Sequence, residues 1–324
     1  MQEQHGYSLG ESDQEILFDV STRAAAAVGD PHAMAQYLLD LPEGLTRSLL
    51  DFARGEGTDG FLLLRGVDVG SVPETPVTHG GSPLPADHPS AATLALVADV
   101  LGALTGYQDE KNGALIHEVH PVRGEEERIE NSGSVKFDFH TENVHHPLRP
   151  DFLGLLCLRQ DHDAVATTRV ASVRNAIPKL TLNQIAVLRE PQFRSLYPTS
   201  FTRGTDGPRP SSGPHPVIFG HRRTFMRFNS HNTQASDARG EAALTALAEA
   251  LEEVSHEVLL SAGDLVVIDN HMAAHGRSAF VPRYDGRDRW LRRFYSVRSV
   301  PRWTEQMIET PRVLPSMTEL QGVL

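Results

Sequence analysis

A histidine and a glutamate separated by one residue are the first feature of this chain that could do chemistry. His140 and Glu142 follow the alternating segment Phe137-Asp138-Phe139. In an extended chain, residues i and i+2 point to the same face, so these two side chains can reach one common point. Imidazole nitrogens and carboxylate oxygens are common metal donors. The pair therefore predicts a metal centre, although H-x-E alone occurs in many chains by chance.

A third ligand has to come from a distant part of the chain. His275, in the segment 269–278, is the best candidate, and His271 in the same segment is its rival. Two histidines and one carboxylate that leave the other side of the metal open form the arrangement of non-haem Fe(II) oxygenases. We therefore predict that His140, Glu142 and His275 bind Fe(II), with positions left for co-substrates.

An arginine-rich segment, 285–293, follows His275. A common co-substrate of such a centre is 2-oxoglutarate, whose far carboxylate needs a fixed cation, and the planar fork of arginine binds carboxylates best. In an extended chain Arg289 and Arg293 share one face. Two inward arginines are costly unless each meets an anion, and an oxygenase acting on an amino acid supplies two carboxylates.

Short strands and a few helices are expected to position these residues. Apolar or alternating runs predict strands at 61–66, 113–120, 137–140, 152–159, 166–173, 217–220, 224–228, 257–260, 265–269 and 290–297. Helical spacing predicts helices at 15–57 with a break at Pro42, and at 91–105, 182–188 and 238–254. This order favours a mainly β fold with flanking helices around a double-stranded β-helix (jelly-roll) core. The ligands would face the mouth of that barrel.

Length and composition are those of an ordinary globular protein. The 324 residues are 40% hydrophobic and 22% charged. We expect a single domain over 1–324, with a polar N-terminal arm at 1–14 and a core at about 60–300. The single cysteine, Cys157, excludes an internal disulfide.

Charge and hydropathy limit the partners. The net charge of −12 argues against nucleic acid or an anionic membrane surface as a partner. The polar N-terminus does not resemble a signal peptide, and no apolar run approaches the length of a membrane span, so a soluble cytoplasmic protein is expected. The oligomeric state stays open.

Several longer motifs occur in a fixed order between about residue 60 and residue 300. They read H-T-E at 140–142, R-P-D-F at 149–152, A-T-T at 166–168, G-D-L-V-V-I-D-N at 263–270, H-G-R at 275–277 and D-G-R-D-R-W-L at 285–291. In order and spacing they resemble the clavaminate synthase-like Fe(II)/2-oxoglutarate oxygenases. That family includes clavaminate synthase and the hydroxylases of free L-arginine, L-asparagine and L-lysine. Glutamate as the carboxylate ligand is typical of it.

The resemblance implies roles for individual residues. His140, Glu142 and His275 match the iron ligands. Arg289 matches the arginine that binds the far carboxylate of 2-oxoglutarate, and Thr168 matches a hydroxyl that assists there. A centre of this kind uses Fe(II), 2-oxoglutarate and dioxygen.

The resemblance also implies substrate contacts. Arg293 matches the arginine that holds the substrate α-carboxylate, and Glu110 lies where the family contacts the substrate amino group. Asn131 and Ser132 lie near positions that line the substrate pocket. Asn229 stands where the family often has an acidic residue that contacts the substrate side chain or amine. Because of this departure, the substrate side chain could be that of lysine, an amide or another polar side chain.

The activity implied by the resemblance is hydroxylation of an unactivated C–H, at the β-carbon, of a free polar or basic L-amino acid such as lysine or arginine, with release of succinate and CO2. One alternative is hydroxylation of an amide or carrier-tethered amino acid in natural-product biosynthesis, such as that of an antibiotic. A thioester would leave no α-carboxylate for Arg293, however. A second alternative is a non-catalytic jelly-roll sensor, which would not need Arg289 and Thr168 beside a dicarboxylate.

Overall fold

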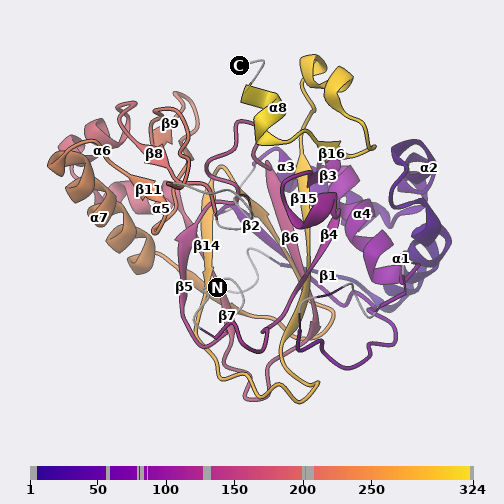
Figure 1. Ribbon diagram of the computed structural model, residues 1–324. Coiled ribbons are helices and arrows are strands. Elements are labelled where there is room, and N and C mark those ends of the chain that lie inside the picture. Colours follow the sequence, from indigo (N-terminus) through magenta and orange to yellow (C-terminus); the bar gives the residue numbers. More distant parts are fainter. Residues whose placement is uncertain are drawn as a thin grey trace.

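Two main β-sheets and two short two-stranded ladders, with helices on the outer faces, make up the described part of the protein (Figure 1). The computed structural model describes residues 6–55, 59–78, 80, 84–85, 87–126, 133–198, 201 and 208–321. Within these residues the prediction of a mainly β fold with flanking helices is confirmed. No helix of the described part is long and apolar enough to cross a membrane.

The larger sheet has eight strands in the described part of the chain. Seven lie in the order β1-β2-β13-β6-β15-β3-β16, and β4 also pairs with β15. Their bounds are β1 Gly6–Ser8, β2 Phe61–Arg65, β3 Ala103–Tyr107, β4 Ile116–Val119, β6 Phe152–Arg159, β13 Leu265–Asp269, β15 Trp290–Val297 and β16 Val313–Leu314.

Within the described residues, the smaller sheet has four strands in the order β12-β7-β14-β5. Their bounds are β5 Phe137–His140, β7 Thr167–Ser172, β12 His256–Leu259 and β14 Ala273–Arg277. Neighbouring strands of this sheet run antiparallel.

Apolar side chains from both sheets form the layer between them. Along β2, Leu62 and Leu64 join a core with the helices, whereas Phe61 and Leu63 join Ile268 and other residues between the sheets. Because both faces of such a strand are covered, it reads as a continuous apolar run.

Helices cover the two outer faces. In Figure 1, α1 and α4 lie on one flank of the strands and α6 and α7 on the other. The first group contains α1 Glu11–Ala24, α2 Pro31–Ala35, α3 Glu43–Ala53 and α4 Pro89–Leu101. The second contains α5 Val173–Ala176, α6 Leu182–Leu188 and α7 Ala238–Glu253, with the short ladders β8 Arg194–Ser195 with β11 Thr233–Gln234 and β9 Ile218–Phe219 with β10 Phe225–Met226. Helix α8 covers Met317–Gln321.

Three local predictions were wrong. The helical segment expected over 15–57, with one break at Pro42, is divided further, into α1, α2 and α3. The helix expected over 91–105 ends at Leu101, and the chain continues as β3 after Gly102. A Cβ at Gly102 would lie 2.2 Å from the carbonyl oxygen of Val297, so glycine permits this close approach. The strand expected at 113–120 is shorter, at Ile116–Val119, and the residues before it form a turn.

The turn at 261–264 joins two strands that belong to different sheets. β12 pairs with β7 in the smaller sheet, and β13 pairs with β2 and β6 in the larger one. The chain therefore passes here from the smaller sheet to the larger one, where β13 pairs with β6. It then returns to the smaller sheet as β14.

Candidate metal centre and its surroundings

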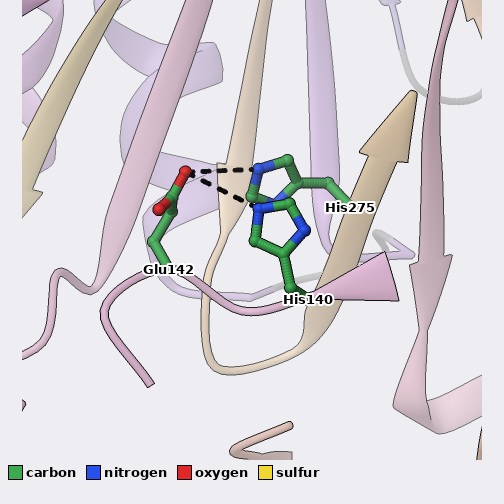
Figure 2. A group of neighbouring side chains, drawn as sticks. All are labelled: His140, Glu142 and His275. Carbon is green, nitrogen blue, oxygen red and sulfur yellow. Dashed lines mark ion pairs between the residues drawn. The ribbon is translucent and has the colours of Figure 1, made fainter. Parts of the chain in front are cut away.

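Three potential ligands converge between the two sheets. His140 ends β5, and His275 of β14 is its direct partner in the antiparallel pair. Nε2 of His140 lies 3.9 Å and Nε2 of His275 3.5 Å from Oε1 of Glu142, and Figure 2 shows both imidazoles turned toward this carboxylate. Phe139 and Ala274 point the other way, into the core beneath the helices. Strand pairing thus brings His140 and His275 together. Glu142 lies in the turn after β5, where its N–H donates to Oδ1 of Asn270 at 2.7 Å.

The ionisation of these side chains suits a metal. Nδ1 of His140 donates to the carbonyl oxygen of Asp138 at 3.0 Å, which leaves the lone pair on Nε2. Burial, and then nearby His275, lowers the pKa of His140 to about 3. Burial alone would raise the pKa of Glu142, but Arg293 and the histidines hold it well below its usual value. Neutral imidazoles and an ionised carboxylate are the metal-binding forms, so this donor set fits Fe(II).

The rival ligand His271 lies on the turn between β13 and β14 and faces other partners. Its Nδ1 lies 2.6 Å from the guanidinium of Arg149. Its Nε2 lies 3.0 Å from Oδ1 of Asp151. These contacts leave it out of the three-residue group.

A buried arginine lies beside a threonine hydroxyl on the facing sheet. Nη2 of Arg289 donates to Oγ1 of Thr168 at 3.0 Å, and Arg289 is 5% exposed. Burial lowers the pKa of its guanidinium. Among the described residues, no carboxylate lies within ion-pair distance of it. A buried guanidinium without an acid is costly, so this pair fits the far carboxylate of 2-oxoglutarate.

Arg277 is a residue that sequence reasoning did not select, although it ends the H-G-R motif. Its guanidinium lies over the ring of Phe280 and donates to the carbonyl oxygen of Val135 at 2.8 Å. Burial, followed by the charge of Arg289, lowers its pKa to about 9. Arg277 and Arg289 are therefore two neighbouring cations.

Arg293 lies on the other side of the centre, between two carboxylates. Its Nη1 lies 2.7 Å from Oε1 of Glu142, and its Nη2 lies 2.9 Å from Oε1 of Glu110. The structure thus brings together the two residues selected for the substrate α-carboxylate and amino group. A cation and an anion placed side by side complement the two charges of a free amino acid.

Two further residues hold this pair, and sequence reasoning missed both. The hydroxyl of Tyr295 lies 3.2 Å from Oε1 of Glu110 and 3.2 Å from Oε2 of Glu142. Nε2 of His117 donates to a backbone carbonyl at 2.9 Å, so its Nδ1 can accept from Arg293 at 3.0 Å. Tyr295 lies two residues after Arg293, so strand alternation was a signal for it. His117 lies on a separate strand, β4, and no pattern in the sequence indicated its contact with Arg293.

Another predicted substrate residue, Asn229, lies beside His140. Asn229 is 8% exposed and forms an isolated antiparallel bridge with His140, so it borders the centre. Asn131 and Ser132 lie outside the described residues.

Comparisons with known proteins agree with this chemistry. The family described as taurine catabolism dioxygenase TauD, TfdA matches residues 39–295. The L-asparagine oxygenase of Streptomyces coelicolor is 36% identical over 305 residues, which cover 91% of this chain and 90% of that protein. Clavaminate synthase 2 of Streptomyces clavuligerus is 35% identical over 260 residues, 79% of each chain.

A solved structure is similar along almost the whole chain. It is an asparagine oxygenase in complex with Fe(II), 2S,3S-3-hydroxyasparagine and succinate. The TM-score is 0.89 at 34% sequence identity, and the match covers 96% of this chain and 99% of that one.

Proposed function

Because the chain belongs to the taurine catabolism dioxygenase TauD, TfdA family, we propose that it is an Fe(II)- and 2-oxoglutarate-dependent dioxygenase that hydroxylates a free polar or basic L-amino acid. The observation that carries this proposal is the pair of Arg293 and Glu110 beside Glu142. The asparagine oxygenase and clavaminate synthase 2 support it as relatives.

The fold supports the same function. We infer that the two facing sheets form a double-stranded β-helix, or jelly roll, and that about residues 60–300 are a single oxygenase domain. Strands β5, β7 and β14 of the smaller sheet and β6, β13 and β15 of the larger one would then enclose the centre.

Fe(II) would be held by His140, Glu142 and His275. With dioxygen and 2-oxoglutarate, the bound metal supplies the oxidising power for C–H hydroxylation, and the co-substrate leaves as succinate and CO2. The far carboxylate of 2-oxoglutarate would meet the guanidinium of Arg289 and the hydroxyl of Thr168.

The substrate would be fixed at both of its backbone charges. Arg293 would bind the α-carboxylate through its guanidinium, and Glu110 would bind the α-ammonium group. The protein's contribution is to hold one C–H near the metal, because reactivity depends on this placement. Hydroxylation at the β-carbon is part of the proposal, supported by the 3-hydroxyasparagine bound in the similar asparagine oxygenase.

Two other functions use parts of the same site. A carrier-tethered amino acid lacks a free α-carboxylate, so Arg293 would have no substrate anion to bind. A metal-binding sensor without catalysis would have no use for the buried Arg289 beside Thr168. Hydroxylation of a free amino acid gives a role to both Arg289 and Arg293.

Coupled turnover tests the proposal. The protein with Fe(II), 2-oxoglutarate and ascorbate would be incubated in air with a panel of free L-amino acids. We expect one of them to increase succinate release and to gain one oxygen atom, seen by mass spectrometry. Succinate release that no free amino acid increases would overturn the proposal.

A further inference from the structure

Asn229 has a side chain that must lie beside the metal ligand His140. Thr141 N–H donates to the carbonyl of Phe228 at 2.7 Å, and Ser230 N–H donates to that of Phe139 at 3.1 Å. This pattern makes His140 and Asn229 a non-hydrogen-bonded antiparallel pair, whose Cα atoms are roughly 4.5 Å apart and whose side chains share one face. Asn229 therefore projects toward the centre.

The amide oxygen of Asn229 is fully used within its own turn. Oδ1 accepts the backbone N–H groups of His231 and Asn232, each at 2.9 Å. Both partners are donors, so the oxygen and not the nitrogen occupies this position, and both of its lone pairs are engaged. No described residue accepts a hydrogen bond from Nδ2. Asn229 can thus offer a ligand only donors.

Carboxylates on the neighbouring segments are already paired with cations. Glu110 and Glu142 both bind Arg293. Asp138, two residues before His140, lies 3.3 Å from Lys136 Nζ and 3.3 Å from His231 Nε2. An ammonium or guanidinium group at the end of a substrate side chain would meet a hydrogen-bond donor at Asn229. These segments offer it no unpaired carboxylate, and burial of a cation without an anion is unfavourable.

We propose that the substrate is an acidic L-amino acid, aspartate or glutamate, whose side-chain carboxylate accepts a hydrogen bond from Nδ2 of Asn229. This inference rests on the proposed function and narrows its substrate class. The α-carboxylate and α-ammonium groups remain with Arg293 and Glu110.

A carboxylate fits this donor better than an amide. An ionised carboxylate is an acceptor only, whereas a substrate amide also brings an NH2 group that needs an acceptor. The one acceptor that Asn229 has is saturated by its turn. A substrate amide nitrogen that is buried without a hydrogen-bond acceptor makes the binding free energy less favourable.

Asn229→Asp is a sharp test because it changes the donor and keeps the turn. The new carboxylate can still accept the N–H groups of His231 and Asn232, but it presents an anion where Nδ2 was. Four substrates would be compared: L-aspartate, L-glutamate, L-asparagine and L-arginine. We expect the wild-type protein to have its highest kcat/KM for L-aspartate or L-glutamate. In the variant, the value for the acidic substrate should fall by about 100-fold or more, and that for asparagine or arginine should rise.

Asn232→Asp is the matched control. It makes the same chemical change three residues away, where Oδ1 of Asn232 accepts from Arg209 at 3.0 Å. It should leave the substrate preference unchanged. Binding of L-aspartate to the Mn(II)- and 2-oxoglutarate-loaded protein, measured by calorimetry, gives a readout without turnover and should weaken only in Asn229→Asp.

The outcomes separate this inference from the proposed function. Best turnover of asparagine or arginine by the wild type, or an unchanged preference in a folded Asn229→Asp protein, would overturn the acidic substrate alone. Succinate release that no free amino acid increases would overturn the hydroxylase itself.

Discussion

Nη1 of Arg293 lies 2.7 Å from Oε1 of Glu142, so the carboxylate assigned to the metal is also paired with a fixed cation. This contact is the main reason why the pKa of Glu142 is low in spite of its burial. Nε of Arg293 has no partner among the described residues. One guanidinium therefore keeps the carboxylate of Glu142 ionised. In the proposed function it would also bind the substrate α-carboxylate, which would couple metal binding to substrate binding.

Glu142→Ala tests the carboxylate ligand. The change removes one of three metal donors and leaves Arg293 beside an empty space, so Mn(II) affinity should fall by more than about 100-fold and coupled succinate release should be lost. Calorimetry and a succinate assay measure the two effects. Glu253→Ala, on the exposed side of α7, is the matched control. Retained activity in Glu142→Ala would refute the ligand assignment.

Arg289→Gln and Thr168→Val test the co-substrate site. Loss of the Thr168 hydroxyl removes one hydrogen bond worth about 1 kcal/mol, so KM for 2-oxoglutarate should rise roughly 5-fold. Loss of the buried charge in Arg289→Gln should raise it by about 100-fold or more. Initial rates over a series of 2-oxoglutarate concentrations measure both. Mn(II) affinity should stay unchanged, and a KM that also stays unchanged would remove these residues from the site.

Local patterns made part of the centre predictable. The i and i+2 spacing of His140 and Glu142 was a local signal for a shared ligand site. The strand β5 ends at His140, however, and Glu142 is held in the following turn by the side chain of Asn270. His275 could be selected only through its motif, because its position opposite His140 depends on the pairing of two strands far apart in sequence. The sheet assignment of β12 and β13 was not predictable for the same reason. Pairing between distant strands follows from tertiary packing, and no local periodicity records it.

Tyr295→Phe tests whether the phenol positions the metal ligand. Its hydroxyl lies 3.2 Å from a carboxylate oxygen of both Glu110 and Glu142. Removing a partner of this kind should weaken Mn(II) binding by about 10-fold while the fold is retained. KM for 2-oxoglutarate should not change, because Arg289 is untouched. Unaltered metal and substrate affinity would mean that the phenol only fills space.

His145→Phe tests the effect of a buried, uncharged histidine on stability. His145 packs against the rings of Tyr197 and Phe201, with centroids 4.6 and 4.5 Å away, and neither ring nitrogen has a partner among the described residues. Burial, followed by nearby His146, lowers its pKa from 6.5 to about 2. Phenylalanine keeps the aromatic contacts and has no nitrogen to protonate.

The sign of the pH effect follows from this shift. Below pH 6.5 the unfolded chain binds a proton at His145 that the native state does not bind until about pH 2. The free energy of unfolding should therefore fall with decreasing pH in this window, by about 1.4 kcal/mol per pH unit for a fully shifted group. Urea unfolding between about pH 8 and about pH 5 should give a flatter profile for His145→Phe than for the wild type. The exposed His32→Phe change is the control. Parallel profiles for wild type and His145→Phe would show that His145 does not remain neutral in the folded protein.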